Sequence, residues 1–445
     1  MPKRTLARAA VLCLVLPCAA LAAAHAQQPP EPEITVILDG VQRPKLRLAY
    51  PAANGVGGLS GEAREAAREL EATLRRDLEA SGVFVVQGPE QLSVLRLTGN
   101  PDSDAELYRS LGNEHLLETD LKQEGDRLVL EGRLTELRGR GFLLGKRYRG
   151  PFDVARRVAH TFADEIVRFF TGEPGIALTQ IAFHSTRDGD DRREVYVMDY
   201  DGHNQRPLTA HQSLSMYPAW SPDGAQIAYV SYVRGAPGIY LVDLASGKKE
   251  ALLTDGTLNI SPAISPDGRT IAFARTVGRG NSEIFLADRN GGNLRQITRS
   301  SGIDTNPAWS PDGRQIAFSS SRGGSPQIYL MGADGSDLRR VTFEGDYNEG
   351  AAWDPDGTRI VHATRRGNEF DLAVTDLVTL ESRTVTRVGG SHESPSFSPD
   401  GRKIAFASGR GNETQIYVLD LASGEVERLT SSGSNLAPAW SGFVQ

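Results

Sequence analysis

The chain has almost no cysteine: Cys13 and Cys18 are its only two among 445 residues, and both lie close to the N-terminus. If that segment is removed, disulfide bonds, thiol catalysis and cysteine-ligated zinc are excluded, so stability must come from packing. A basic excess is also missing, because 56 acidic residues outnumber 49 basic ones and leave a net charge of −7. Nucleic acid is therefore not an expected partner, since a polyanion needs a basic surface.

Long hydrophobic runs are missing except at the start of the chain. Three basic residues precede the apolar stretch 9–24, which is followed by the small-x-small site Ala24-His25-Ala26. A membrane span needs about 20 apolar residues, so we predict a secretory signal peptide over residues 1–26 rather than an anchor. A lipoprotein modified at Cys18 is the alternative, but Pro17 stands where such sites have a small residue.

Two architectures are predicted after this segment. Three prolines between residues 29 and 32 favour an extended arm, which we assign to residues 27–42. Within residues 33–170, apolar residues at i+4 spacing predict a helix over residues 62–80, and Asp153 is the candidate N-cap of a last helix. Strands are expected over 34–38, 46–50, 83–86, 116–121, 127–137 and 142–148. This mixture predicts a smaller N-terminal α/β domain.

From residue 176 onward the sequence repeats itself. A Pro-Asp-Gly turn recurs with its proline at positions 222, 266, 311, 355 and 399, a spacing of 44 or 45 residues. All four tryptophans of the chain occupy one slot of this repeat. Each unit reads as four strands, so we predict a six-bladed β-propeller over residues 176–445. The first unit lacks its tryptophan-bearing strand, and the surplus copy Pro438–Ser441 is expected to supply it and close the ring.

The strand order predicts which face of the ring binds a partner. The Pro-Asp-Gly turns on one face are short and uniform, whereas the loops that enter each tryptophan-bearing strand vary and converge on the central channel. Simple turn formation in solvated loops is the alternative interpretation of their polar residues. The side chains expected to ring this mouth are Asn259, Thr305, Asn306, Asn348, Glu349, His392, Glu393 and Asn435.

The sequence shows no pattern typical of catalysis or metal binding. It lacks a G-x-S-x-G elbow, and its histidines are scattered without the spacing of metal ligands. His160, on the predicted last helix of the α/β domain, is expected to pack against a neighbour. We therefore expect no enzymatic activity, no metal and no cofactor. An enzyme with dispersed loop residues, or a propeller that binds a glycan or another small ligand, are the alternatives.

Four local motifs resemble the TolB family of Tol–Pal system proteins. They are His160-Thr161-x-Ala163-Asp164-Glu165, Thr171-Gly172, Asp199-Tyr200-Asp201-Gly202-x-Asn204-Gln205 and the terminal Pro438-Ala439-Trp440-Ser441. The resemblance covers the whole chain after the predicted signal peptide. It implies a periplasmic adaptor, without enzymatic activity, that links the inner-membrane TolA/TolQ/TolR complex to the outer-membrane lipoprotein Pal. Such an adaptor maintains outer-membrane integrity and supports cell division.

The resemblance also implies two binding regions. Pal would dock on the propeller mouth: Thr305 matches a family contact position, Asn259 and Ser261 match positions but not residue types, and Asn306 stands where an acidic residue is common. The C-terminal domain of TolA would bind the arm, in which a proline-rich start leads into a strand-forming run that could add to a sheet edge. The arm residues implied are Glu31, Glu33, Ile34, Thr35, Val36, Ile37 and Asp39. Pal occupancy would change the availability of this arm.

Overall fold

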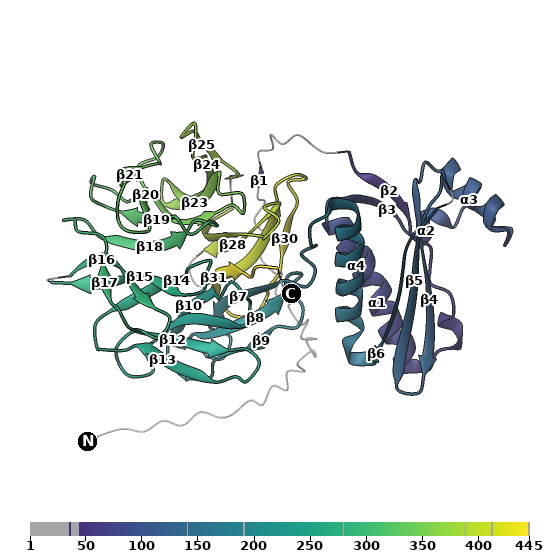
Figure 1. Ribbon diagram of the computed structural model, residues 1–445, viewed down its shortest axis with the longest axis horizontal. Coiled ribbons are helices and arrows are strands. Elements are labelled where there is room, and N and C mark those ends of the chain that lie inside the picture. The colour runs from purple at the N-terminus through teal and green to yellow at the C-terminus, as the bar shows by residue number, and fades with distance from the viewer. Residues whose placement is uncertain are drawn as a thin grey trace, which may run out of the picture. The chain divides into compact units, whose positions relative to one another are not determined.

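The computed structural model describes residues 35–36, 44–139, 141–189, 192–278, 280–387, 389–410 and 413–443. The predicted signal peptide, with both cysteines, and the arm residues Glu31, Glu33, Ile34, Ile37 and Asp39 lie outside the described residues. The described chain contains an α/β domain followed by a β-propeller (Figure 1). In this part of the chain no helix is long and apolar enough to cross a membrane.

A mixed sheet forms one layer of the α/β domain, with the order β3-β2-β4-β5-β6. β2 (Leu46–Ala49) runs parallel to β3 (Phe84–Gln87) and to β4 (His115–Glu124). β4, β5 (Arg127–Glu136) and β6 (Gly141–Pro151) form an antiparallel meander. The strands expected between residues 46 and 148 are thus present, with ends shifted by a few residues.

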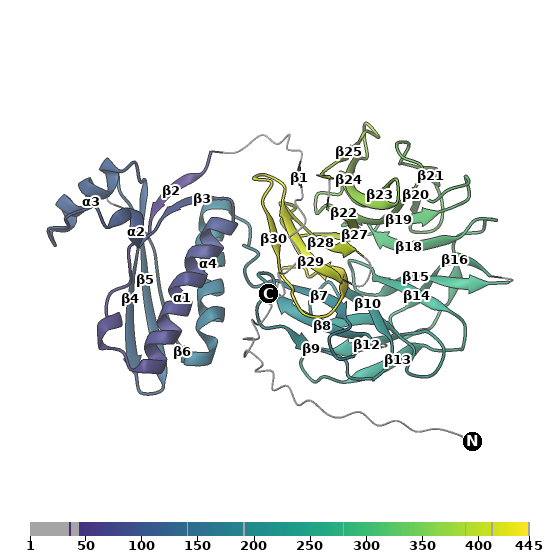
Figure 2. The same cartoon turned by 180° about the vertical axis from the view of Figure 1, so that it is seen from behind.

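Two long helices, α1 (Gly61–Ala80) and α4 (Ala155–Thr171), cover one face of this sheet (Figures 1 and 2). Ser60 caps α1, because its side-chain oxygen accepts a hydrogen bond from the N–H of Ala63. The predicted N-cap of α4 is wrong. Asp153 lies in a short 3-10 turn, η2 (Phe152–Val154), and α4 starts after Val154 without a side-chain cap. The apolar stripe of each helix is buried against the sheet; it includes Leu70, Leu74, Leu78, Phe162 and Ile166.

Two shorter helices were not predicted from the sequence. They are α2 (Pro89–Leu92) and α3 (Pro101–Ser110), and a 3-10 turn, η1 (Val56–Gly58), precedes α1. Asn100 caps α3, since its side-chain oxygen accepts hydrogen bonds from the N–H groups of Asp102 and Ser103. Asparagine directly before proline at the first helical position is a helix-start pattern, so this signal was available in the sequence.

The described residues of the propeller form six four-stranded antiparallel sheets, the blades, which follow one another in a ring (Figure 1). Blade 1 contains β7 (Gln180–Ser185), β8 (Glu194–Asp199) and β9 (Arg206–Pro207). Blade 2 contains β10 (Ser215–Trp220), β11 (Gln226–Ser231), β12 (Gly238–Asp243) and β13 (Lys249–Leu253), and blade 3 contains β14 (Asn259–Ile264), β15 (Thr270–Val277), β16 (Asn281–Asp288) and β17 (Arg295–Gln296).

The second half of the ring repeats this plan. Blade 4 contains β18 (Asp304–Trp309), β19 (Gln315–Ser320), β20 (Gln327–Gly332) and β21 (Arg339–Arg340). Blade 5 contains β22 (Asn348–Trp353), β23 (Arg359–Arg366), β24 (Glu369–Asp376) and β25 (Ser382–Thr384). Blade 6 contains β27 (Ser391–Phe397), β28 (Lys403–Arg410), β29 (Glu413–Asp420) and β30 (Val426–Arg428).

The C-terminal strand closes the ring. β31 (Asn435–Trp440) pairs antiparallel with β7 and places Trp440 opposite Ile181, so blade 1 has the order β31-β7-β8-β9. Both ends of the propeller therefore meet in one sheet, and no blade edge is left for a missing neighbour. The closure predicted from the surplus tryptophan-bearing copy is confirmed.

Three of the tryptophans at the end of the inner strands form hydrogen bonds between neighbouring blades, which explains why they recur at one position of the repeat. The indole N–H of Trp309 donates to the carbonyl of Ala263 in the preceding blade at 3.1 Å, and the indole of Trp353 donates to Ala308 at 3.0 Å. Trp220 makes the same bond to Ala439 at 2.8 Å, which joins blade 2 to the closing strand. Each of these indoles thus ties an inner strand to its neighbour and satisfies its own donor.

A threonine near the end of five of the six blades forms a second repeated contact, which was not predicted from the sequence. In five blades its buried hydroxyl oxygen accepts the N–H of a residue in the third strand, at 2.8 to 3.0 Å. The bond holds the short outer strand to the sheet. The pairs are Thr209 with Val195, Thr298 with Ile284, Thr342 with Ile328, Thr386 with Leu372 and Thr430 with Ile416.

A short strand of the arm pairs with the propeller. β1 (Thr35–Val36) lies antiparallel to β26 (Thr386–Arg387), with Thr35 opposite Arg387 and Val36 opposite Thr386. β26 belongs to the connection between blade 5 and blade 6. The strand-forming tendency predicted for the arm is therefore realised at these two residues.

Candidate functional site

The mouth of the channel is built from the first residues of the six inner strands, β10, β14, β18, β22, β27 and β31. In each of them the pairing with the next strand shifts register. The residue inside this bulge has a positive φ, between 50° and 66°. In five of the six strands the next residue is a proline, which cannot donate to the ladder and is compatible with a bulge. The bulge residues are Tyr217, Ser261, Asn306, Gly350, Ser394 and Ala437.

The first residue of each inner strand is buried, except in β27, where the buried residue is the second, His392. This is contrary to the sequence-based expectation. The side chains of Asn259, Asn348, His392 and Asn435 have no exposed surface, so the expectation that they line the opening is wrong. The amide of Asn348 donates to Gln327 Oε1 at 2.8 Å, and His392 Nδ1 lies 2.9 Å from Ser408 Oγ. These buried side chains stabilise the loops of the mouth through their hydrogen bonds.

The following residues of the inner strands remain partly exposed. Ser261, Thr305, Asn306, Glu349 and Glu393 are half-buried, and they are the predicted site residues that the structure brings to the mouth. Asn348 and Glu349 stand before the bulge and pair in register with β23, so their side chains alternate: Asn348 is buried in the blade and Glu349 is half-buried at the mouth.

Two carboxylates and two tyrosines meet at the mouth. Tyr347 donates its hydroxyl hydrogen to Glu349 Oε2 at 3.0 Å. Burial raises the pKa of Glu349, and burial together with the nearby charge of Glu349 raises the pKa of Glu393. Tyr217, 38% exposed, was not among the predicted residues. Burial raises its pKa; the positive charge of Arg193 opposes this rise, and the charges of both glutamates add to it.

Ion pairs brace the loops around the mouth. Arg275 binds Asp255 at 2.6 Å, and Arg365 binds Asp346 at 2.7 Å. In blade 4, Arg322 binds the buried Asp304 at 2.7 Å. Because each pair links a loop to a strand of its own blade, the rim is a rigid frame that can present recognition side chains.

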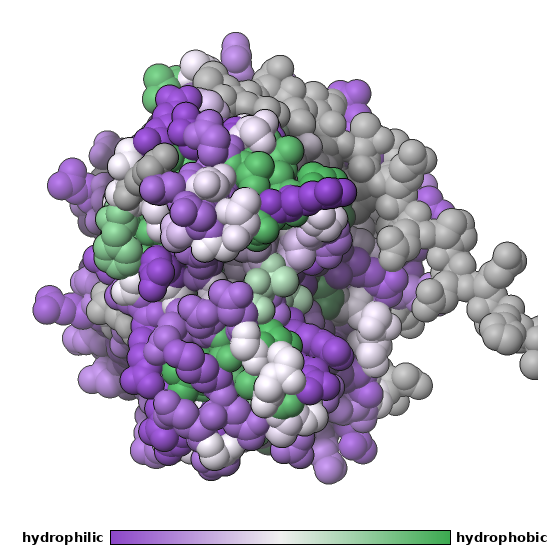
Figure 3. Space-filling model, turned by 90° about the vertical axis from the view of Figure 1, so that its right-hand side faces the viewer, coloured by the Kyte–Doolittle hydropathy of each residue, from purple (hydrophilic) through white to green (hydrophobic). Residues whose placement is uncertain are grey.

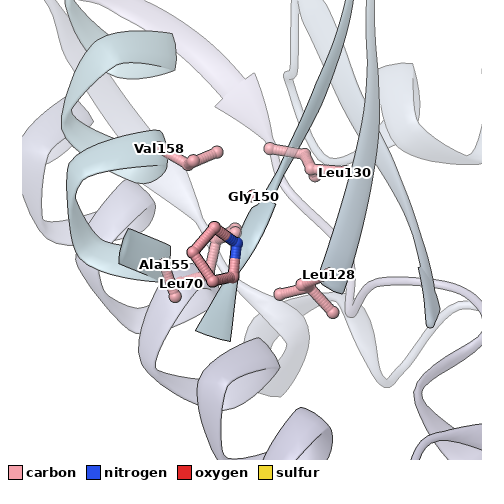
Figure 4. Close-up of a pocket in the computed structure, with 7 residues that line it drawn as sticks. Leu70, Leu128, Leu130, Gly150, Ala155 and Val158 are labelled. Atoms are coloured by element: carbon pink, nitrogen blue, oxygen red, sulfur yellow. The ribbon is translucent and has the colours of Figure 1, made fainter. Parts of the chain in front are cut away.

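A small depression between α1, α4 and the ends of β5 and β6 is lined only by apolar groups: Leu70, Leu128, Leu130, Gly150, Pro151, Ala155 and Val158 (Figure 4). It has no polar side chain to orient a ligand. In the view of Figure 3, hydrophilic side chains predominate and hydrophobic ones form small, separate patches.

A buried polar network joins the α/β domain to the propeller. His160 Nδ1 on α4 lies 2.7 Å from Asp77 Oδ2 on α1, and Asp77 Oδ1 accepts the hydroxyl hydrogen of Tyr200 at 2.7 Å. Asp201 in the same propeller turn pairs with Arg156 of α4. We call Asp77, Arg156, His160, Tyr200 and Asp201 the joint network. Two of the motifs that carried the family resemblance meet here, and the packing expected for His160 is confirmed.

The charges in the joint network compensate one another. Burial alone would lower the pKa of His160, but the hydrogen bond to Asp77 and its charge raise it above the usual value. Burial alone would raise the pKa of Asp201, but Arg156 and other nearby cations lower it. His160, Asp199 and Asp201 place ligand-type atoms within 4.8 Å of one another. The guanidinium groups of Arg76 and Arg156 already pair with the carboxylate of Asp201, so we interpret this cluster as an ion-pair network.

A family model decides the assignment. The model described as the TolB beta propeller domain matches residues 167–399 and 352–443. The chain belongs to the TolB β-propeller family. The Tol-Pal system protein TolB of Desulfosudis oleivorans is 34% identical over 207 residues, which cover 45% of this chain and 46% of that protein. The Tol-Pal system protein TolB of Anaeromyxobacter dehalogenans is 36% identical over 229 residues, 51% of each chain.

A solved structure extends the likeness beyond the propeller. The crystal structure of TolB from Acinetobacter baumannii covers 93% of this chain and 100% of its own, with a TM-score of 0.74 and 27% identity. The chain spans about half the length of the curated relatives it matches in sequence. The TolB family relation thus includes both folded parts at the level of structure, and the propeller at the level of sequence.

Proposed function

We propose that this protein is a periplasmic, non-catalytic adaptor of the Tol–Pal envelope system. In this role the propeller mouth binds the lipoprotein Pal, and the N-terminal arm binds the C-terminal domain of TolA. The adaptor would thereby link the inner-membrane TolA/TolQ/TolR complex to the outer membrane, maintain its integrity and support cell division. The relatives' shared name as Tol-Pal system proteins supports the system, and the features below support the two binding regions.

The observation that carries the Pal proposal is the mouth itself. Rigid inner strands present half-buried polar side chains on one irregular face, and buried residues beneath them hold the loops in place. A standard protein interface buries about 800 Å² per partner, an area that the rim of a propeller can supply. In this proposal Ser261, Thr305, Asn306, Glu349 and Glu393 contact Pal, while Asn259, Asn348 and His392 position the loops.

The pairing of β1 with β26 supports the role of the arm. Thr35 and Val36 use their backbone groups in a two-residue ladder with Thr386 and Arg387. We propose that TolA pairs with this same edge of the strand, so that docking on the propeller and binding of TolA compete. β26 is followed along the chain by β27, which carries Glu393. A shift of the mouth loops on Pal binding could thus reach the docking site of the arm.

Binding measurements with purified domains test the proposal. The soluble domain of Pal and the C-terminal domain of TolA from the same organism are titrated separately into the protein without residues 1–26, by calorimetry. We expect both to bind, and removal of residues 27–42 to abolish TolA binding while Pal still binds. Failure of Pal to bind the intact protein would refute the proposed function.

The coupling between the two regions needs a separate titration. TolA is titrated into the protein with and without saturating Pal, and we expect different affinities in the two cases. Linkage requires the reciprocal experiment to give the same ratio of affinities. Equal TolA affinities under both conditions would show that the arm and the mouth act independently.

A further inference from the structure

The residue directly before the bulge in each inner strand differs from blade to blade around the mouth. Blades 2, 3, 4 and 1 carry Met216, Ile260, Thr305 and Leu436 there, so none of these four positions is charged. The corresponding residues of the adjacent blades 5 and 6 are Glu349 and Glu393. The ring thus has a single acidic sector, made by equivalent positions in two neighbouring strands.

The two carboxylates of this sector lack a cation of their own. The neighbouring rim acids Asp255, Asp304 and Asp346 each pair with an arginine. Among the residues that the structure describes, Glu349 has only the hydroxyl of Tyr347 as a partner, and neither glutamate forms an ion pair. Both are half-buried and close enough for the charge of Glu349 to raise the pKa of Glu393. The negative charge of Glu349 and Glu393 is therefore not balanced by a neighbouring cation within the described residues.

An aromatic side chain stands across the channel from this sector. Tyr217 belongs to blade 2, which lies opposite blade 5 in a ring of six. The positive charge of Arg193 acts on its phenol, and the charges of Glu349 and Glu393 act on it with smaller effects. Its edge contacts the ring of His184 with a centroid distance of 5.7 Å, so its position is defined. A cation between the glutamates and Tyr217 would meet two carboxylates and one ring face or hydroxyl.

The surroundings favour a side chain of a protein over a free ion. Val233, Ile303 and Phe343 are 41%, 51% and 58% exposed. By strand order they lie in loops on the mouth face: Val233 between β11 and β12, Ile303 before β18 and Phe343 before β22. Such apolar residues around a polar centre are typical of a protein-binding surface, where a partner covers them and excludes water from the charged contact.

We propose that the mouth receives one lysine or arginine side chain of its protein partner between Glu349 and Glu393, with Tyr217 facing them across the channel. This inference rests on the proposed function and specifies the chemistry of the partner at the same site. A basic side chain of the partner would balance the negative charge of Glu349 and Glu393. The exposed apolar residues on the mouth face would be covered by a protein partner but not by a free ion.

The test compares two double variants with matched charge changes. E349Q/E393Q removes the acidic sector, and E381Q/E425Q removes two exposed carboxylates from the same two blades, in the turns after β24 and β29 on the opposite face. The soluble domain of Pal is titrated into each variant at low and high salt. We expect E349Q/E393Q to bind about tenfold more weakly or worse, with less salt dependence, and the control to bind like the wild type.

A double-mutant cycle identifies the partner's cation. Each lysine and arginine of Pal is changed to methionine and titrated against the wild type and E349Q/E393Q. One of these substitutions should weaken binding to the wild type but not to the double variant, because the interaction is already lost.

The outcomes separate the inference from the proposed function. If Pal binds the wild type and E349Q/E393Q equally, or if no basic residue shows coupling, the inference is wrong and the function stands. If millimolar calcium chloride raises the melting temperature of the wild type but not of E349Q/E393Q, the sector is an ion site and the inference is overturned. If Pal does not bind the wild type, the proposed function fails, and the inference fails with it.

Discussion

Replacing Asp77 by alanine removes the acceptor that two buried donors share. His160 Nδ1 lies 2.7 Å from Asp77 Oδ2, and the hydroxyl of Tyr200 lies 2.7 Å from Asp77 Oδ1. Asp77 and His160 are 3% exposed and Tyr200 is 5% exposed, so water cannot replace the lost acceptor without opening the joint network. An unsatisfied buried polar group costs about 1–3 kcal/mol. Two such groups give an expected destabilisation of about 2–6 kcal/mol.

The loss should appear as uncoupling of the two folded parts. All four tryptophans lie in inner strands of the propeller, so indole fluorescence reports on the propeller, whereas circular dichroism at helical wavelengths reports mainly on α1 and α4. In guanidinium titrations the two signals should change together in the wild type. In Asp77→Ala the helical signal should be lost at lower denaturant than the fluorescence signal.

The pH dependence gives an independent check on the same contact. Burial by itself lowers the pKa of His160, and Asp77 raises it above its ordinary value of about 6.5. A group with a raised pKa in the folded state contributes its stability fully below the unfolded pKa and loses it as the pH rises through the folded pKa. Asp77→Ala should therefore destabilise more at about pH 6 than at about pH 9.

The conservative variant Asp77→Asn serves as the control, since it keeps the volume and one acceptor oxygen. It should cost less than Asp77→Ala and should reduce the pH dependence, because the charge is gone. Coincident transitions and an unchanged midpoint in Asp77→Ala would refute the role given to the joint network.

Three further predictions concern the propeller. Deletion of residues 435–445 removes the closing strand, and we expect aggregation or loss of a cooperative melt by calorimetry; an unchanged melt would contradict closure. Trp309→Phe loses the bond to the carbonyl of Ala263 and should cost about 1–2 kcal/mol in denaturant titrations. Thr298→Val leaves the N–H of Ile284 and a buried carboxylate without their partner; we expect a loss of about 2–4 kcal/mol, with Thr298→Ser close to wild type.

The propeller could be predicted from the sequence because each blade is built mostly from strands that are consecutive in the chain. Its four strands follow one another along the chain, so the period of 44 or 45 residues counts the blades directly. The closing strand could also be predicted, since the tryptophan-bearing segment around Trp440 is a surplus copy of the inner strand that no further strands follow. Its partner β7 is distant in sequence, but a ring leaves only one strand unpaired.

The mouth could be predicted as a face but not residue by residue. Strand order alone decides which loops converge on the channel. Whether Asn348 or the adjacent Glu349 reaches the opening depends on which of the two alternating faces of the strand turns into the blade, and only the neighbouring strands decide that. Tyr217 was missed because it stands in a strand rather than in a variable loop.

The sequence by itself determined the number of blades, their closure and the binding face, because these follow from repeated short-range patterns. Only the tertiary structure decided which polar side chains are buried, which carboxylates lack a cation and which distant groups meet at Asp77. Burial and charge balance depend on neighbours that are far apart in the chain, so no local pattern records them.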